Sequence, residues 1–107
     1  MILELEGYKI LGAETAEEAL DHLTKISPDM VISDVKLPGL DGFALFDNVR
    51  ANSKFQNVPF IFITAYNDPL SIEHAKEYGA TAYITKPYNL DELLVLVNRV
   101  FTEKFDS

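Results

Sequence analysis

The sequence predicts an α/β fold in which helices cover both faces of a doubly wound parallel sheet. Short apolar stretches alternate along the chain with segments of helical period. The stretch "PFIFI" at residues 59–63 shows no polar alternation, which is typical of a strand buried on both faces. The length of 107 residues favours a single domain with one core, spanning residues 1–107.

The first elements predicted are a short helix, a strand and a longer helix. Met1–Glu6 is interpreted as the last turns of a helix, because Gly7 stands where a left-handed residue commonly ends one. Tyr8–Ala13 is predicted to be a strand. Thr15 and Glu18 have the spacing of a capping box, so a helix begins there. Before Ser27-Pro28 ends it, this helix has apolar residues at helical spacing, namely Ala16, Ala19, Leu20, Leu23 and Ile26.

The rest of the chain contains three more strands, each followed by a helix. The strands are predicted at Met30–Ser33, Pro59–Ile63 and Ala82–Thr85, and the helices at Phe43–Ala51, at Pro69–Tyr78 and after the N-cap Asn89. The last helix carries Asp91 and Glu92 in its first turn, where the helix dipole favours negative charge. In sheets of this kind, reactive groups gather beyond the carboxyl ends of the strands.

Composition excludes several classes of function. The chain has 48% hydrophobic and 24% charged residues, as is ordinary for a globular domain. It contains no cysteine, so disulfides, thiolate metal sites and thiol catalysis are excluded. The longest aliphatic run, Leu93–Val97, is far shorter than the ~20 residues of a membrane span. A net charge of −8 argues against direct binding to nucleic acid.

Polar side chains follow three successive strands. Asp34 follows Met30–Ser33, Thr64 follows the "PFIFI" strand, and Lys86 follows Ala82–Thr85. The carboxylate, the hydroxyl and the ammonium are expected to meet at one rim of the sheet. A carboxylate can attack phosphorus and form an acyl phosphate, while a hydroxyl and an ammonium stabilise phosphoryl oxygens. Ala65 would leave room for the incoming group.

The segments "LELEGYKIL", "ISDVKLPGLDG", "VPFIFITAY" and "GATAYITKPYNLDELL" resemble the receiver domains of two-component response regulators. The spacing of 30 positions from Asp34 to Thr64 and of 22 from Thr64 to Lys86 suits that family. The resemblance implies the flavodoxin-like receiver fold and a cytoplasmic signalling protein of a phosphorelay rather than an enzyme. Its partners would be a histidine kinase or phosphotransfer protein, and an output protein or domain.

The resemblance also implies a role for each site residue. Asp34 would be the phosphoacceptor, and Thr64 and Lys86 would sense the phosphoryl group. Tyr83 matches the aromatic residue that swings inward after the threonine in activated receivers; a half-buried strand tyrosine is the plainer interpretation. The bond between Lys86 and Pro87 is often cis in this family.

Receivers also bind Mg²⁺, and the sequence departs from the family there. Their first central strand ends in an acidic pair, which holds the metal together with the acceptor aspartate and a backbone carbonyl, here that of Lys36. Only 33 residues precede Asp34, so we expect an N-terminally truncated fold without that strand. Asp34 and the Lys36 carbonyl are then the predicted ligands. Glu4 and Glu6 stand on the wrong side of Gly7 to replace the pair.

The absent strand would leave two neighbours without a partner. In the receiver order 2-1-3-4-5 it lies between Tyr8–Ala13 and Met30–Ser33, and it helps to cover Ile32 and Ile61. The neighbours could close up, or Met1–Ala13 could be exchanged with a second chain. Strand exchange or pairing in a homodimer is the prediction, because closing the gap would require the helices to repack.

Three other functions compete with that of a phosphoacceptor. A phosphohydrolase of the haloacid dehalogenase type needs a second aspartate two residues after the nucleophile, where this chain has Lys36. A flavin carrier needs a phosphate-binding loop after its first strand, and none is present. The remaining alternative is a protein-interaction module that keeps the receiver shape and works without phosphorylation.

Overall fold

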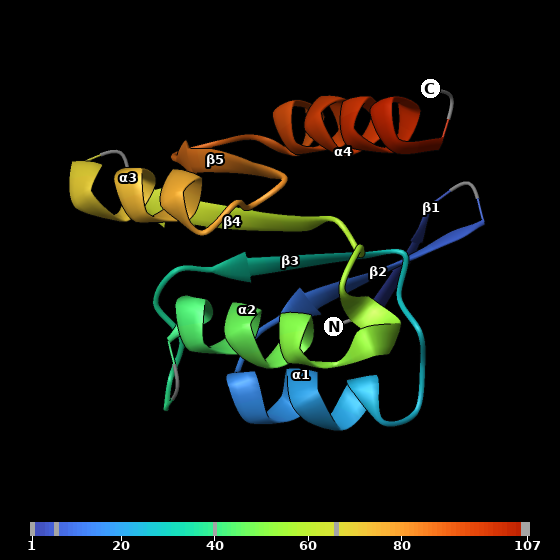
Figure 1. Cartoon of the computed structure of the whole chain (residues 1–107). Coiled ribbons are helices and arrows are strands. Elements are labelled where there is room, and N and C mark those ends of the chain that lie inside the picture. Colours follow the sequence, from blue (N-terminus) through green and yellow to red (C-terminus); the bar gives the residue numbers. More distant parts are fainter. Residues whose placement is uncertain (1, 6, 40, 66, 106–107) are drawn as a thin grey trace.

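The computed structural model describes residues 2–5, 7–39, 41–65 and 67–105, and in these ranges the chain forms a five-stranded sheet flanked by helices (Figure 1). The strand order is β1-β2-β3-β4-β5; β1 is antiparallel to β2 and the other strands are parallel. The predicted α/β class is therefore confirmed. The strands are β1 Ile2–Leu5, β2 Tyr8–Ala13, β3 Met30–Asp34, β4 Phe60–Ala65 and β5 Ala82–Lys86; the helices are α1 Ala16–Leu23, α2 Gly42–Ala51, α3 Pro69–Glu77 and α4 Leu90–Phe105, with a short 3₁₀ helix at Ser53–Phe55.

The two faces of the sheet carry separate hydrophobic clusters, as two-sided burial of parallel strands predicts. Helices α1, α2 and α3 pack on one face, and α4 packs on the other (Figure 1). Phe60 and Phe62 of β4 point to the three-helix side and are fully buried there. Ile61 lies between them in sequence and points to α4. None of the helices in the described part of the chain is long and apolar enough to cross a membrane.

The predicted helix starts are confirmed by their caps. The Thr15 hydroxyl accepts a hydrogen bond from the backbone N–H of Glu18 at 3.1 Å, and the Asn89 side chain accepts one from Glu92 at 2.8 Å. Helix α1 ends at Leu23, three residues before the predicted Ile26. The Thr24 hydroxyl donates to the carbonyl oxygen of Asp21 at 2.6 Å and so caps the helix early.

The prediction of a helix at Met1–Glu6 is wrong. Ile2–Leu5 forms β1 and pairs with β2 in an antiparallel hairpin, with Leu5 opposite Tyr8. Gly7 has φ +87° and supplies the left-handed residue of the hairpin turn instead of a helix C-cap. So short a helix has too few internal hydrogen bonds to offset its nucleation, whereas a strand gains bonds from β2. Met1 and Glu6 themselves lie outside the described residues.

The predicted gap between Tyr8–Ala13 and Met30–Ser33 is closed. Strands β2 and β3 pair directly, with Ile10 opposite Met30 and Ala13 opposite Ser33. Helix α4 covers this junction, so Ile32 is only 8% exposed. The strand edges that were predicted to lack hydrogen-bond partners therefore pair with each other within one chain. Unpaired edges were the reason to predict a homodimer formed by strand exchange or pairing, and the structure removes that reason.

Candidate functional site

The carboxyl ends of β3, β4 and β5 form one rim of the sheet, where the sequence places its polar candidates. Asp34 is the last residue of β3 and lies opposite Ile63. Lys86 is the last residue of β5 and lies opposite Ala65, the last residue of β4. The peptide bond that follows Lys86 is cis, as predicted. The parallel register thus brings Asp34 and Lys86 to the same end of the sheet from either side of β4.

Asp34 and Lys86 form an ion pair. The Lys86 Nζ lies 3.2 Å from the Asp34 Oδ1, although the angles are not those of a hydrogen bond. Oδ1 is buried and has no hydrogen-bond partner among the described residues. The Asp34 side chain as a whole is nevertheless 36% exposed, so its accessible surface belongs to Oδ2 and the side-chain carbon atoms. One carboxylate oxygen is held against a cation while the other can meet an incoming electrophile.

A small cavity of about 130 Å³ opens beside this pair. Ala65 lines it, so the small side chain that was expected to leave room lies at the cavity next to the carboxylate. The backbone there is held by a hydrogen bond from Val35 N–H to the Ile63 carbonyl at 3.0 Å. The complete lining is Asp34, Val35, Lys36, Ile63, Ala65, Asp68 and Lys86.

Asp68 is a member of this cavity that the sequence reasoning missed. Its carboxylate accepts hydrogen bonds from the Ser71 hydroxyl at 2.6 Å and the Ser71 N–H at 3.2 Å, and so caps α3. The pKa of Asp68 is lowered, chiefly by the Ser71 side chain and then by the Ser71 backbone, with smaller effects of the positive charges of Lys36 and His74. The sequence contained a signal for this role, because Asp directly before a Pro is a common start of a helix, and Asp68 precedes Pro69.

Thr64 lies next to the cavity but does not line it. Along β4 the side chains of Ile63 and Ala65 point to the Asp34 side, so Thr64 between them points to the other face. Thr64 is 2% exposed, and its hydroxyl has no hydrogen-bond partner among the described residues. Tyr83 points to the same face, because it lies opposite Phe62 in the register. Contact of Thr64 with a group on Asp34 stays a prediction.

The orphaned hydroxyl makes Thr64→Val a stability test. Valine has the same shape without the hydroxyl, so the free energy of unfolding is expected to rise by about 1 kcal/mol. Urea unfolding followed by circular dichroism measures this change. Thr85→Val on the paired position of β5 serves as the control. A loss of stability with Thr64→Val alone would show that the hydroxyl does have a partner.

The predicted Mg²⁺ ligands do not make up a metal site. No group of three His, Cys, Asp or Glu side chains that could hold a metal occurs in the described part of the chain. In the cavity, Asp34 Oδ1 is paired with the Lys86 ammonium and the Asp68 carboxylate is bonded to Ser71, so the remaining oxygen of Asp34 and the Lys36 carbonyl are the donors left for a metal. Mg²⁺ requires oxygen donors in near-octahedral geometry. The donors among the described residues do not fit this ion.

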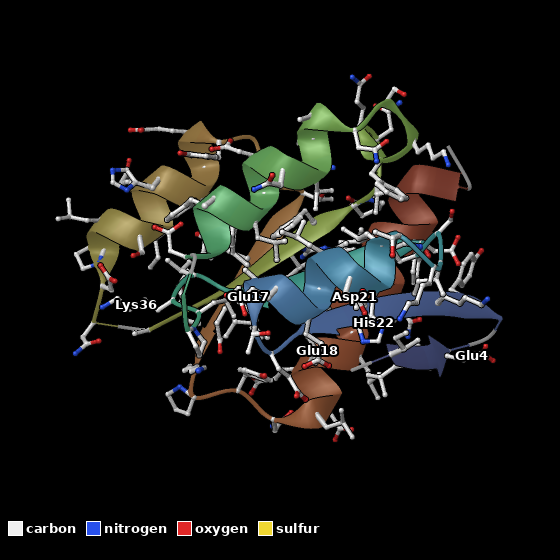
Figure 2. The ribbon with its side chains drawn as sticks, turned by 90° about the horizontal axis from the view of Figure 1, so that it is seen from below. Glu4, Glu17, Glu18, Asp21, His22 and Lys36 are labelled. Carbon is white, nitrogen blue, oxygen red and sulfur yellow. The ribbon has the colours of Figure 1, made fainter. Side chains whose placement is uncertain are left out.

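Glu4 lies away from the rim. Glu4 is opposite Lys9, near the amino end of β3, whereas Asp34 ends that strand. In Figure 2, Glu4 and Lys36 lie at opposite ends of the molecule, and Glu18 and Asp21 lie along α1. Glu4 therefore cannot supply the second carboxylate. Glu6 lies outside the described residues.

The chain is an α/β domain with a mostly parallel sheet and a carboxylate–lysine pair at its carboxyl rim, and comparison with known proteins gives its class. The response regulator receiver domain family matches residues 1–98. The chain is 35% identical to sporulation initiation phosphotransferase F of Bacillus subtilis over 92 residues, covering 86% of this chain and 73% of that protein. It is 36% identical to the DNA-binding transcriptional regulator NtrC of Klebsiella pneumoniae over 96 residues, covering 90% of this chain and 20% of that protein.

Solved structures show the same fold. A putative response regulator from Chloroflexus aurantiacus superposes with a TM-score of 0.78 at 36% identity, covering 84% of this chain and 74% of that chain. The chemotaxis response regulator CheY4 of Vibrio cholerae gives 0.73 at 34% identity, covering 80% and 72%. The chain belongs to the response regulator receiver domain family and has a role in two-component signalling.

Proposed function

We propose that Asp34 accepts a phosphoryl group from a phosphohistidine of a kinase or phosphotransfer protein. The exposed carboxylate oxygen attacks phosphorus and forms the acyl phosphate. The phosphorus–nitrogen bond breaks, its electron pair stays on the imidazole nitrogen, and that nitrogen takes up a proton. The Lys86 ammonium lies 3.2 Å from Oδ1 and balances the negative charge as it builds up. The Asp34–Lys86 pair beside a cavity is the observation that carries the proposal.

Among the described residues, the cavity offers no general acid for hydrolysis of an acyl phosphate. Lys36 stands two residues after Asp34 and lines the cavity, in the place where a phosphohydrolase would need a general acid. Asp68 is in the same cavity but is tied to Ser71 and held ionised by that contact. We infer that the chain acts as a signalling module rather than as an enzyme, and membership of the family supports a place in the cytoplasm. A phosphodonor labelling experiment with Asp34→Asn as the comparison tests the acceptor, and it is described in the Discussion.

The phosphoryl state is proposed to reach a partner through β4 and β5. Thr64 and Tyr83 point to the same face of the sheet, toward α3. A threonine that turns to a phosphoryl group on Asp34 would leave its buried place and let Tyr83 move inward, a shift between two packed arrangements. Residues 69–77 of α3, β5 and α4 form the surface next to Tyr83, which we call the output face.

Tyr83→Ala is expected to weaken binding of an output partner to this face. The substitution removes the ring that links the position of Thr64 to the surface. Glu17→Ala and Asp21→Ala on α1 are the controls, because α1 packs on the face of the sheet opposite α4 and is separated from α3 by α2 (Figure 1). Isothermal titration of the partner with each variant gives the comparison. Equal losses for Tyr83 and the α1 variants would remove the argument for this face.

The poor fit of Mg²⁺ favours one second candidate. A receiver-shaped module that binds its partner without phosphorylation would need only the fold and the output face. Partner binding that is the same for the unmodified chain, for the chain treated with a phosphodonor and for Asp34→Asn would select this alternative.

A further inference from the structure

β1 is an edge strand whose outer side is open. On its inner side it pairs with β2, with Leu3 opposite Ile10 and Glu4 opposite Lys9. No strand of the described chain pairs with its outer side. Because successive residues of a strand direct their N–H and C=O groups to alternate sides, half of the four residues of β1 direct these groups outward. Such groups can pair with an extended peptide.

The face of β1 on the α4 side is apolar and only partly covered. Leu3 is opposite Ile10, which packs in the hydrophobic cluster under α4, so Leu3 lies on that face. Leu5 lies there too, opposite Tyr8, whose ring stacks on Phe101 of α4 with 4.2 Å between the centroids. The helix thus covers the hairpin near Leu5, whereas Leu3 is 46% exposed. An apolar side chain on an added strand would extend the cluster and cover Leu3.

The face of β1 on the α1 side carries negative charge. Glu4 is exposed and follows Leu3, so the two-residue period of the strand turns its side chain to this face. In Figure 2, Glu18 and His22 lie on the part of α1 that is nearer to β1. The Glu18 carboxylate is 3.5 Å from the His22 Nε2, and a neutral imidazole does not cancel its charge. Lys9 is opposite Glu4 on the inner side of β1, whereas an added strand would lie on the outer side.

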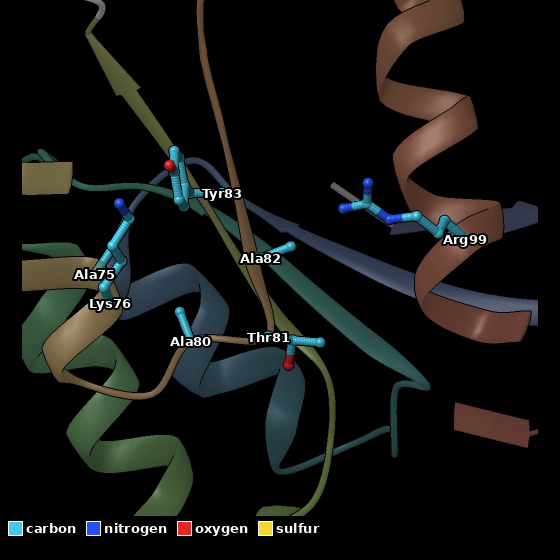
Figure 3. Close-up of a pocket in the computed structure, with 7 residues that line it drawn as sticks. All are labelled: Ala75, Lys76, Ala80, Thr81, Ala82, Tyr83 and Arg99. Atoms are coloured by element: carbon cyan, nitrogen blue, oxygen red, sulfur yellow. The ribbon is translucent and has the colours of Figure 1, made fainter. Parts of the chain in front are cut away.

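The other edge of the sheet has the opposite charge. β5 is the second edge strand, and Lys76 of α3 and Arg99 of α4 lie on either side of it (Figure 3). A cationic segment would therefore be repelled at β5 and attracted at β1. The chain as a whole, with 17 acidic and 9 basic residues, also attracts cations. Charge thus selects β1 for a basic partner.

We propose that the outer edge of β1 binds an extended, basic segment of a partner protein by strand addition. The side chains of that segment would alternate, with apolar ones against Leu3 on the α4 side and basic ones beside Glu4 and Glu18 on the α1 side. A second copy of this chain is less suitable, because antiparallel pairing of two β1 strands would gather the carboxylates of both copies on one face. Binding requires no phosphoryl group on Asp34, so it adds an interaction to the proposed function.

Titration of the ¹⁵N-labelled chain with the peptide acetyl-Lys-Val-Lys-Ile-Lys-Val-Lys-amide tests the proposal without a phosphodonor. A second peptide has the same composition and charge in the order Lys-Lys-Val-Ile-Val-Lys-Lys, so a strand of it cannot direct all its lysines to one face. We expect the alternating peptide to shift the amide signals of residues 2–5 and the second peptide to bind about tenfold more weakly. Shifts that spare residues 2–5 would contradict the proposal.

The variant Glu4→Gln/Glu18→Gln is expected to bind the alternating peptide about tenfold more weakly. Glu73→Gln/Glu77→Gln removes the same charge from exposed positions of α3 and should bind as the unsubstituted chain does. Equal affinities for the two peptides, or equal losses in the two variants, would overturn the proposal, because net charge alone would then explain the binding. Dimerisation of the chain that Leu3→Lys abolishes would also overturn it, because a second copy would then occupy the edge.

Discussion

Gly42→Ala is expected to destabilise the chain by about 3 kcal/mol, the upper part of the range for overpacking a tight contact. A Cβ at this position would overlap the carbonyl oxygen of Asp34 and lie 3.0 Å from the Cα of Val35. Both neighbours are backbone atoms and cannot turn away. The Gly42 N–H also donates to the Val35 carbonyl at 2.6 Å, so the start of α2 is tied to the end of β3. The added methyl group must separate them.

The displacement would act on the site as well as on stability, because Asp34 is one of the two residues pushed. Urea unfolding measures the free energy, and the NMR signal of the Asp34 amide reports the local change. Asp47→Ala on an exposed position of the same helix is the control, and it is expected to change stability by less than about 0.5 kcal/mol. Equal unfolding midpoints for Gly42→Ala and the control would show that α2 can move away without loss.

Asp34→Asn is expected to abolish phosphoryl transfer and to leave the fold intact. The amide has nearly the shape of the carboxylate but has no anionic oxygen to attack phosphorus. The lost ion pair with Lys86 costs little stability, because the lysine side chain is 54% exposed and stays hydrated. We expect a change of less than about 1 kcal/mol in the free energy of unfolding. Activity and stability are thereby separated in one variant.

Much of the fold could be predicted because its signals are local. The capping residues Thr15 and Asn89 mark helix starts through bonds to residues three positions ahead, which a sequence shows directly. The buried run in β4 is apolar at every position because helices cover both of its faces. The end of a parallel strand then places Asp34 and Lys86 at one rim, and their ion pair follows from the register.

The errors arise where the structure of a segment depends on its pairing with residues far away in the sequence. The preference of Ile2–Leu5 for a strand depends on β2 as a hydrogen-bonding partner, and a single Gly7 serves equally well in a helix C-cap or a hairpin turn. The pairing of β2 with β3 is likewise a tertiary outcome. Thr64 lies at the carboxyl end of β4 as strand order predicts, but the two-residue period of the strand turns its side chain to the face opposite Asp34, so its contact with a group on Asp34 stays a prediction.

Intact-mass spectrometry after treatment with phosphoramidate and Mg²⁺ tests the central claim, that Asp34 is the phosphoacceptor. Because the donors present do not fit the ion, the chain is also prepared with an added N-terminal strand that carries an acidic pair. We predict that the extended chain gains the mass of one phosphoryl group, that its Asp34→Asn variant gains none, and that the chain of 107 residues is labelled far less. Labelling that persists in the Asp34→Asn variant, or an extended chain that stays unlabelled beside a labelled receiver, would contradict the account.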